Sequence, residues 1–307
     1  MPSDTATTAP QFSVIIPVYN DWEPVDNCLR SLHHQTGGSE FEVIIVDDGS
    51  QHLAPESIRQ WSNCFPLTIA QQPHTGIAAA RNRGVQTSKG TILVFTDADC
   101  RFHSDCLSAL IATVSDSPQH KYFQLHLTGD SSTMFGRAEE LRLTTLQDHL
   151  LQPDGCIRYL NTSGFAMRRS ALMDQTFLFD PNAQRSEDTM LLTNLIQNGE
   201  LPFFAPDAVV RHAVRMSITE CIRKDVRVAW LEARTFERIA AGGIRVRMKN
   251  RERIAILRSM WKASRQPSIG RIAWFVLAAR QALQRAISLL YRCLPFRPKV
   301  RAAATSA

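Results

Sequence analysis

The chain has 307 residues, of which 44% are hydrophobic and 21% charged, and its formal net charge is +6. These values indicate a soluble globular protein with one domain of roughly 200 residues and a smaller appendage. The seven cysteines form an odd count and include no C-x-x-C pair, which argues against a disulfide framework and against a structural zinc site. The first ten residues lack the basic and apolar regions of a secretory signal, so we expect a cytoplasmic protein.

The charge is divided unevenly between the two parts of the chain. Residues 1–210 hold 13 Lys and Arg against 24 Asp and Glu, a net charge of −11, whereas residues 211–307 hold 22 against 5, a net charge of +17. Such asymmetry predicts that the C-terminal part faces an anionic partner: membrane headgroups, a phosphorylated acceptor or nucleic acid. The alternative is a solvated basic surface.

Short β-branched runs alternate with longer amphipathic stretches over the first two hundred residues. This pattern predicts an α/β domain with a largely parallel central sheet flanked by helices. The expected strands are 12–19, 41–46, 67–71 and 91–95, and the expected helices between them are 23–35, 58–61 and 76–87. Ligands of open α/β sheets bind beyond the carboxyl ends of the strands. We therefore expect the polar residues that follow three of these strands to gather at one edge.

The C-terminal part of the sequence predicts two Arg-rich helices, 218–240 and 269–294, joined by a basic segment at 245–265. The longest uncharged run in the last helix is 272–279, which is too short to span a bilayer. Two alternatives remain for this last helix. It packs on the α/β domain, or it lies in a membrane interface, where its arginines reach anionic lipids at the inner face. The predicted organisation is a disordered N-terminus (1–11), an α/β domain (12–215) and a basic helical extension (216–307).

Two carboxylates, Asp97 and Asp99, follow the hydrophobic strand that ends at Phe95. If the backbone stays extended, side chains separated by one residue point to the same side. Hard oxygen ligands of this kind suit Mg²⁺ or Mn²⁺, which can bridge them to a diphosphate and stabilise the charge on a departing nucleotide. Two exposed loop aspartates are the alternative interpretation.

Two further segments can contribute to a nucleotide site. Asp48 lies in an acidic strand end, where a carboxylate can accept hydrogen bonds from a base or a ribose; an ordinary Asp-Gly turn is the alternative. Residues 76–84 predict a helix of small residues in which Arg81 or Arg83 could bind a base or phosphate, unless the helix only packs. The spacing matches neither a dinucleotide fingerprint nor a P-loop.

The order of four motifs resembles the inverting glycosyltransferases of family 2, which have the GT-A fold. These motifs are the first strand through Asn20, Val46-Asp47-Asp48-Gly49-Ser50, the 76–84 segment with Ala80-Arg81-Asn82, and the Asp97/Asp99 pair. The resemblance covers about residues 12–215 and weakens through 104–160. It implies a transferase that moves a sugar, of the hexosyltransferase type, from a nucleotide diphosphate donor, expected to be a UDP-sugar, to an acceptor hydroxyl.

The resemblance also implies roles for individual residues. The base pocket would be lined by Pro17, Val18, Tyr19 and Asp48, Arg81 would approach the nucleotide, and Asp97 would meet ribose or metal. Asp99 would bind Mn²⁺ or Mg²⁺, and His212 would complete the metal site. Gly164 and Arg168 belong to a segment similar to the acceptor-side loop.

The general base implied by the resemblance is Asp188, with Glu187 as the other candidate. Asp188 also precedes a predicted helix at 189–198, so a helix cap is the alternative role. His212 could equally be a solvated loop histidine.

Processive members of the family carry a Q-x-x-R-W motif, which the corresponding 225–230 segment does not match. The sequence therefore predicts non-processive transfer, with products related to envelope glycans or glycosylated metabolites. The alternatives are a sugar-nucleotide pyrophosphorylase, although its Gly-rich activating loop is absent, and a non-catalytic module that docks on membrane. No nucleic-acid-binding module is recognisable, so we expect no nucleic-acid partner.

Overall fold

The computed structural model describes residues 10–38, 40–130, 132–172, 178–181, 183, 185–213, 217–241, 250–267 and 270–293. Most of the predicted disordered N-terminus lies outside these residues. The strands are β1 (Phe12–Val18), β2 (Phe41–Asp47), β3 (Leu67–Gln71), β4 (Ile92–Phe95), β5 (Cys100–Phe102), β6 (Tyr122–Gly129), β7 (Phe165–Arg168) and β8 (Phe203–His212). The helices are α1 (Glu23–His33), α2 (Glu56–Arg59), α3 (Ile77–Thr87), α4 (Cys106–Asp116), α5 (Met134–Leu150), α6 (Glu187–Gln197), α7 (Ile218–Ala241), α8 (Asn250–Ala263) and α9 (Gly270–Cys293). Short 3-10 helices occupy Gln60–Asn63, Thr162–Gly164 and Arg169–Leu172.

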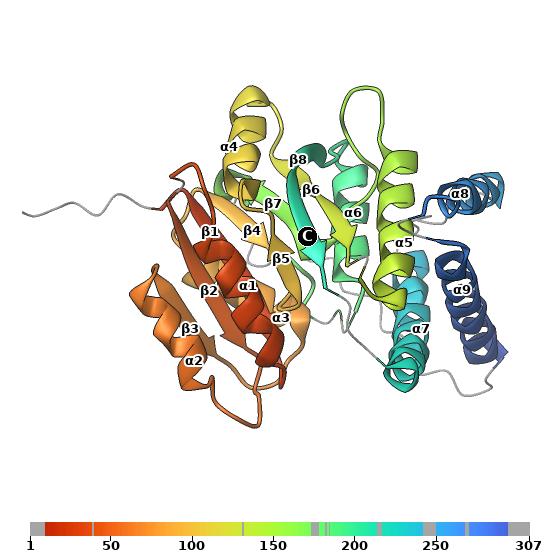
Figure 1. The fold of residues 1–307 in the computed structure, drawn as a ribbon, viewed down its shortest axis with the longest axis horizontal. Helices are drawn as coiled ribbons and strands as arrows, with labels where there is room; N and C mark the ends of the chain where they lie inside the picture. The colour runs from red at the N-terminus through yellow and green to blue at the C-terminus, as the bar shows by residue number, and fades with distance from the viewer. Residues whose placement is uncertain are drawn as a thin grey trace, which may run out of the picture.

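The described strands form one sheet in the order β3-β2-β1-β4-β7-β6-β8-β5 (Figure 1). Neighbours from β3 to β4 run parallel, as do β6 and β8. In contrast, β7 is antiparallel to both β4 and β6, and β5 is antiparallel to β8. The α/β fold is confirmed, and the sheet is parallel in the part where helices alternate with strands and mixed beyond β4.

Helices cover both faces of the parallel part of the sheet. Alternate residues of β1 point to opposite faces: Val14 and Ile16 belong to the core under α1 and α4, and Ile15 belongs to the core under α3 and α6. All three side chains are completely buried. This two-sided burial explains why the first strands read as continuous hydrophobic runs in the sequence.

The strand order brings three carboxyl ends to one edge of the sheet. β1 lies between β2 and β4. Its residue Val18 pairs with Asp47 of β2, and its residue Ile15 pairs with Phe95 of β4. The backbone N–H of Asp48 donates to the carbonyl of Val18 at 2.8 Å, which holds the two loops that follow β1 and β2 together. The predicted clustering of polar residues at this edge is therefore observed.

The C-terminal helices α8 and α9 pack against α5 of the α/β domain. Buried side chains from α5, α8 and α9 form a third hydrophobic cluster, and these helices lie at the opposite end of the molecule from β3 (Figure 1). The basic segment predicted at 245–265 contains α8, whose helical fold the sequence interpretation did not assign. No helix in the described part of the chain has an apolar stretch long enough to cross a membrane.

A buried ion pair joins α7 to α9. Asp225 on α7 is 1% exposed and accepts hydrogen bonds from Arg280 at 2.8 and 2.9 Å and from Gln284 at 3.0 Å. The three polar groups satisfy one another inside the contact between the helices. They therefore fix the register of α9 on α7.

We expect Asp225→Ala to lower the free energy of unfolding by about 3 kcal/mol, because it leaves a largely buried guanidinium without its counter-ion. Denaturant unfolding checks this value. Arg30→Ala, which removes an exposed i,i+4 pair with Asp26, is the control and should cost less than about 1 kcal/mol. Equal losses in the two variants would contradict a special role for the buried pair.

Candidate active site

A cavity of about 1330 Å³ lies at the carboxyl edge of the sheet. Pro17, Val18 and Tyr19 line it from the end of β1, and α7 and α9 contribute Lys224 and Arg280. The other predicted site residues among its lining are Arg81, Asp97, Asp99, Glu187, Asp188 and His212. Most of the predicted site is thus gathered in one cavity, which the C-terminal helices help to enclose.

Arg81 lies at the centre of this arrangement and is 1% exposed. It donates through Nη2 to Asp97 at 2.7 Å and through Nη1 to Glu187. Burial alone would lower the pKa of Arg81, but the carboxylates of Asp97 and Glu187 raise it, so the guanidinium is firmly charged. Arg81 therefore connects the end of β4 to the start of α6.

The backbone between Asp97 and Asp99 is not extended, contrary to the assumption that both side chains face one point. A hydrogen bond from the N–H of Cys100 to the carbonyl of Asp97, at 3.1 Å, closes a turn here. As a result Asp97 faces Arg81 and accepts a second hydrogen bond from Ser163 at 2.7 Å, whereas Asp99 faces His212. The turn separates the two carboxylates into different contacts.

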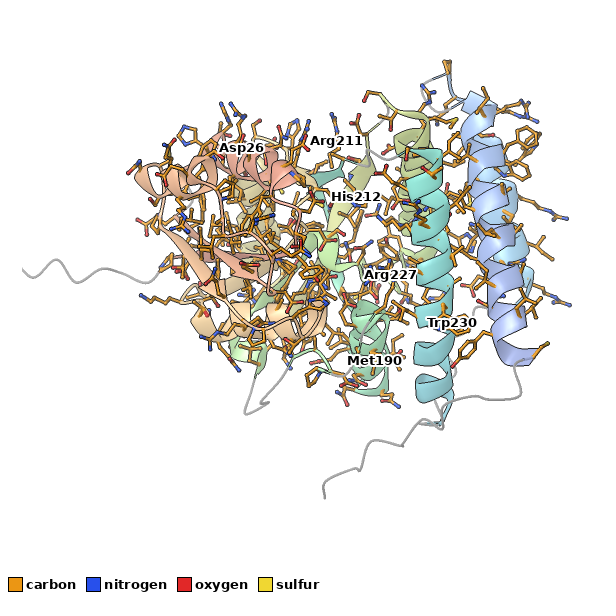
Figure 2. The ribbon with its side chains drawn as sticks, turned by 90° about the horizontal axis from the view of Figure 1, so that it is seen from below. Asp26, Met190, Arg211, His212, Arg227 and Trp230 are labelled. Carbon is orange, nitrogen blue, oxygen red and sulfur yellow. The ribbon has the colours of Figure 1, made fainter. Side chains whose placement is uncertain are left out.

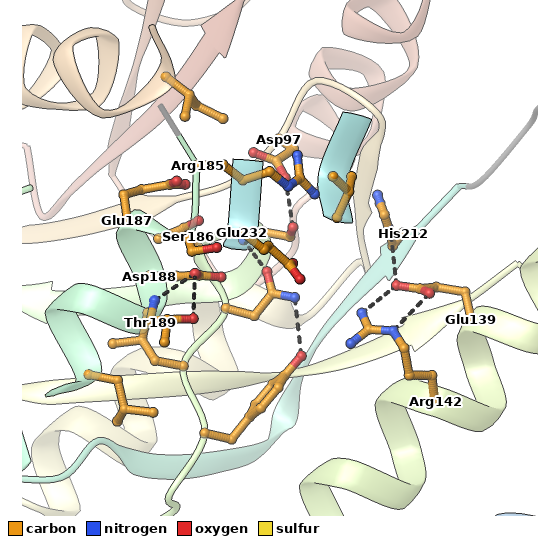
Figure 3. Close-up of a pocket in the computed structure, with 18 of the residues that line it drawn as sticks. Asp97, Glu139, Arg142, Arg185, Ser186, Glu187, Asp188, Thr189, His212 and Glu232 are labelled. Carbon is orange, nitrogen blue, oxygen red and sulfur yellow. Dashed lines mark hydrogen bonds and ion pairs between the residues drawn. The ribbon is translucent and has the colours of Figure 1, made fainter. Parts of the chain in front are cut away.

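Asp99 and His212 begin a chain of alternating charges. His212 Nε2 lies 3.1 Å from Asp99 Oδ2, and its Nδ1 lies 3.6 Å from Oε1 of Glu139. Arg142 donates to both oxygens of Glu139, at 2.6 and 3.0 Å (Figure 3). Burial would lower the pKa of His212, but Asp99 and Glu139 raise it to about 10.

The donor atoms around Asp99 can accommodate a metal ion. Among the described residues, one oxygen of Asp99, the ring of His212 and the sulfur of Cys100 lie within 4.8 Å of one another. Burial and the nearby aspartates raise the pKa of the Cys100 thiol well above its usual range, which disfavours the thiolate and makes this sulfur a poor ligand. The ring of His212 must give up the proton that Asp99 and Glu139 favour before it can bind a cation. One carboxylate and one imidazole remain. This pair suits Mn²⁺ better than Mg²⁺, which prefers oxygen ligands.

Asp188 lies in the first turn of α6, in the wall of the cavity. Its Oδ1 accepts a hydrogen bond from the backbone N–H of Thr189 at 2.6 Å (Figure 3). Burial, together with the neighbouring carboxylate of Glu187, raises the pKa of Asp188 to about 7. The capping position of α6 is Ser186, and Asp188 accepts only from the N–H of the next residue, so this contact does not support the helix-cap alternative. The raised pKa suits a general base.

The residue before Glu187 and Asp188 adopts a strained backbone conformation. Ser186, the first capping position of α6, has a φ angle of 61° and makes no capping hydrogen bond through its side chain. Left-handed backbone is costly for a residue other than glycine and is concentrated at functional sites. Here it turns the chain so that Glu187 meets Arg81 while Asp188 faces the cavity.

Asp48 is 4% exposed and does not line the cavity in the described structure. It accepts the backbone N–H groups of Thr75 and Gly76, both at 2.9 Å, and pairs with His74 at 2.8 Å. His74 in turn stacks on Tyr19, with ring centroids 4.0 Å apart. Asp48 thus shapes the loop beside the predicted base pocket.

The two residues predicted for the acceptor side lie away from the cavity. The guanidinium of Arg168 donates to the carbonyls of Val114 at 2.7 Å and His120 at 3.0 Å, near the C-terminal end of α4. Gly164 is buried, and its carbonyl accepts from Gln124 at 2.8 Å. The residues just before it, Asn161, Thr162 and Ser163, line the cavity instead.

Sequence reasoning missed Glu139, Arg142 and Ser163. Glu139 and Arg142 are spaced i,i+3 on α5, within the stretch where the family resemblance weakens, and nothing local distinguishes them from an ordinary helical ion pair. Ser163 directly precedes Gly164 in the sequence, but its hydrogen bond to Asp97 depends on the sheet order. Only the fold brings these side chains to the site.

Replacing Arg81 by methionine should lower the free energy of unfolding by about 3 kcal/mol, because Asp97 and Glu187 then lose the buried cation between them. Denaturant unfolding measures this loss. Arg83→Met, on the exposed side of the same helix, is the matched control and should change the value by less than about 0.5 kcal/mol. If the two variants were equally stable, Arg81 would not hold the site together.

The sequence is similar to known glycosyltransferases. The family model of glycosyl transferase family 2 matches residues 13–176. Glycosyltransferase AglE of Haloferax volcanii is 40% identical over 112 residues, which cover 36% of this chain and 37% of the relative. The amylovoran biosynthesis glycosyltransferase AmsB of Erwinia amylovora is 29% identical over 190 residues, which cover 58% of this chain and 61% of the relative. The matches to the first three curated relatives span between 22% and 37% of their lengths.

Solved structures show the same fold. The mannosyltransferase PcManGT from Pyrobaculum calidifontis, in complex with GDP-Man and Mn²⁺, is 20% identical, with a TM-score of 0.57 over 94% of this chain and 82% of that one. TarS 1–349 of S. aureus, in complex with UDP-GlcNAc, is 18% identical, with a TM-score of 0.54 over 92% and 91%. With the family match covering more than half of the sequence, the chain belongs to glycosyl transferase family 2 and has the GT-A fold.

Proposed function

We propose that this chain is an inverting, metal-dependent and non-processive transferase that moves one hexose-type sugar from a UDP-sugar to an acceptor hydroxyl. The observation that carries the proposal is the position of Asp188, a carboxylate with a pKa of about 7, in the same cavity as Asp99 and His212. Family membership favours sugar transfer over the pyrophosphorylase and binding-module alternatives.

In this proposal Asp188 removes the proton from the acceptor hydroxyl as its oxygen attacks the anomeric carbon. A hydroxyl is a weak nucleophile until a base within hydrogen-bond reach takes its proton. Direct attack by the acceptor inverts the anomeric centre and needs no enzyme nucleophile. Glu187 is the less suitable base, because Arg81 already occupies one of its oxygens.

The metal would be held by Asp99 and His212. A bound divalent cation stabilises the negative charge that develops on the departing nucleoside diphosphate. Asp97, held by Arg81 and Ser163, would contribute to ribose binding or to the surroundings of the metal. Glu139 would orient His212 from behind, as carboxylates commonly do for metal-binding histidines.

The proposed donor is based on the ligands of related structures and on the residues near the predicted base pocket. TarS binds UDP-GlcNAc and PcManGT binds GDP-Man, so relatives with this fold take either nucleotide. Tyr19 and His74 offer a stacked aromatic edge beside the predicted base pocket. The 225–230 segment forms part of α7, where Asp225 pairs with Arg280 and no Q-x-x-R-W motif is present, which supports non-processive transfer. An envelope glycan or a metabolite is the proposed acceptor.

We expect Asp188→Asn to lower donor hydrolysis by a factor on the order of 10² or more, because the water that replaces the acceptor loses its base. Thermal stability should change little, since Asn keeps an oxygen for the N–H of Thr189. The assay uses whichever sugar nucleotide is hydrolysed fastest in a panel of UDP- and GDP-sugars. For the native chain, the rate should rise with pH through about 7, because only the ionised carboxylate accepts a proton.

Asp116→Asn, an exposed change outside the cavity, is the matched control and should leave the rate and its pH profile unaltered. Hydrolysis by Asp188→Asn at the native rate would exclude Asp188 as the base and make Glu187 the next candidate.

Glu139→Gln should weaken Mn²⁺ binding about 10- to 100-fold, because the ring of His212 loses the carboxylate that orients it. Titration of Mn²⁺ followed by electron paramagnetic resonance measures this without any activity assay. Asp148→Asn, an exposed acidic residue on the same helix, should bind Mn²⁺ like the native chain. Unchanged affinity in Glu139→Gln, or saturable Mn²⁺ binding by Asp99→Ala at native affinity, would place the metal elsewhere.

A further inference from the structure

The two long sides of α9 have different surroundings. Toward the protein, Arg280 and Gln284 bond to Asp225, and Ala273, Leu277 and Tyr291 are buried. The other side carries apolar residues that contact solvent. α9 thus shows an apolar surface on the side where a packed helix normally carries its polar residues.

The exposed side is continuous along the whole helix. It consists of Ile272, Phe275, Ala279, Ala282, Ala286, Leu289 and Leu290. Successive members are three or four residues apart, with Leu290 beside Leu289, so they share one face. The four large side chains are 58–66% exposed: Ile272 64%, Phe275 58%, Leu289 60% and Leu290 66%. We call this set the outer face of α9.

The surroundings of the outer face are cationic and aromatic. Arg271 and Arg285 are exposed on α9, which contains no Asp or Glu. At its N-terminal end, the rings of Trp261, Trp274 and Phe275 pack together, with centroids 5.0 to 6.3 Å apart. Arginines beside an apolar face with clustered aromatic rings are typical of helices that lie in the headgroup region of a bilayer.

The position of α9 leaves this face accessible. α9 lies at the edge of the molecule, at the opposite end from β3, with α7 beside it (Figures 1 and 2). A second copy of the chain could also cover an apolar face. However, residues 211–307 carry a net charge of +17, so two copies joined here would bring like charges together, whereas an anionic surface would neutralise them.

We propose that the outer face of α9 docks on an anionic lipid bilayer, lying in its interface with Phe275, Leu289 and Leu290 among the acyl chains and Arg271 and Arg285 at the phosphates. The inner side of the same helix contributes Arg280 to the cavity wall. Docking would therefore place the cavity one helix away from the membrane surface. The proposal does not depend on which donor or acceptor the cavity binds.

The experiment measures sedimentation of the full chain with vesicles of phosphatidylcholine alone or mixed in equal parts with phosphatidylglycerol. The native chain should bind the mixed vesicles and not the neutral ones, and added salt should weaken binding because it screens exposed charges. Phe275→Ser/Leu289→Ser/Leu290→Ser should lower the partition coefficient about tenfold or more, since three apolar side chains no longer enter the bilayer. Its fold should persist because all three side chains are exposed, which a thermal melt verifies.

A second part of the experiment tests the two exposed arginines of α9. Arg271→Gln/Arg285→Gln should weaken binding about fivefold per arginine, which corresponds to the ~1 kcal/mol that a basic residue contributes near an anionic bilayer. The matched controls are Leu53→Ser, an equally exposed apolar residue (62%) of the catalytic domain, and Arg30→Gln/Arg83→Gln, which removes two exposed arginines there. Both should bind like the native chain.

Three results would overturn the proposal. The first is native-like vesicle binding by the triple serine variant, and the second is equal binding to neutral and mixed vesicles. The third is a native dimer, detected by sedimentation velocity, that the triple variant converts to a monomer, because a second copy would then cover the face. None of the substituted residues on α9 lines the cavity, so donor hydrolysis without vesicles should stay native in these variants. A failure of docking is thereby distinguished from a failure of the proposed reaction.

Discussion

The guanidinium of Arg81 lies buried between two carboxylates that are far apart in the sequence. Asp97 follows β4 at the sheet edge, and Glu187 opens α6. Two carboxylates brought together in a buried place would repel each other, and a shared cation removes that repulsion. Because Glu187 is held in this way, the next residue, Asp188, has a defined position in the cavity. The contact therefore couples the donor side of the site to the residue proposed as its base.

The C-terminal helices are part of the site and not an independent appendage. α7 and α9 contribute Lys224 and Arg280 to the cavity, and the Asp225 to Arg280 pair fixes the two helices against each other. In processive relatives the corresponding segment carries a Q-x-x-R-W motif. Here the same positions serve helix packing, and Trp230 packs against Tyr291 with ring centroids 4.8 Å apart. The basic extension thus has one side that lines the cavity and one side that faces solvent.

Local sequence signals were sufficient for the first four strands and for the edge at which they end. β1, β2, β3 and β4 are short apolar runs followed by polar residues, and each begins within one residue of its predicted start. Asp99, His212 and Asp188 were predicted from motifs at element ends, and all three line the cavity. Tertiary contacts could not be predicted from these local signals. The turn at Asp97 to Cys100 was not foreseen, because a period-two argument holds only for extended backbone.

Other errors have a similar physical origin. Arg168 was assigned to the acceptor side on its motif, but the antiparallel pairing of β7 with β4 carries it to the opposite end of the strand, beside α4. Glu139 could not be found, because its relation to His212 requires α5 to pack beside β6 and β8. The mixed half of the sheet was not foreseen for the same reason: the pairing of β7, β6, β8 and β5 is set by long-range contacts.

The central claim is that the cavity is a metal-assisted site for a nucleoside diphosphate. Calorimetric titration of UDP and of GDP into the full chain, with Mn²⁺ and with excess chelator, tests it most directly. The account predicts saturable one-to-one binding of at least one nucleotide in Mn²⁺, with UDP favoured, and loss of that binding in chelator and in Asp99→Ala. Binding that persists unchanged in chelator and in Asp99→Ala, or no binding of either nucleotide in Mn²⁺, would contradict it.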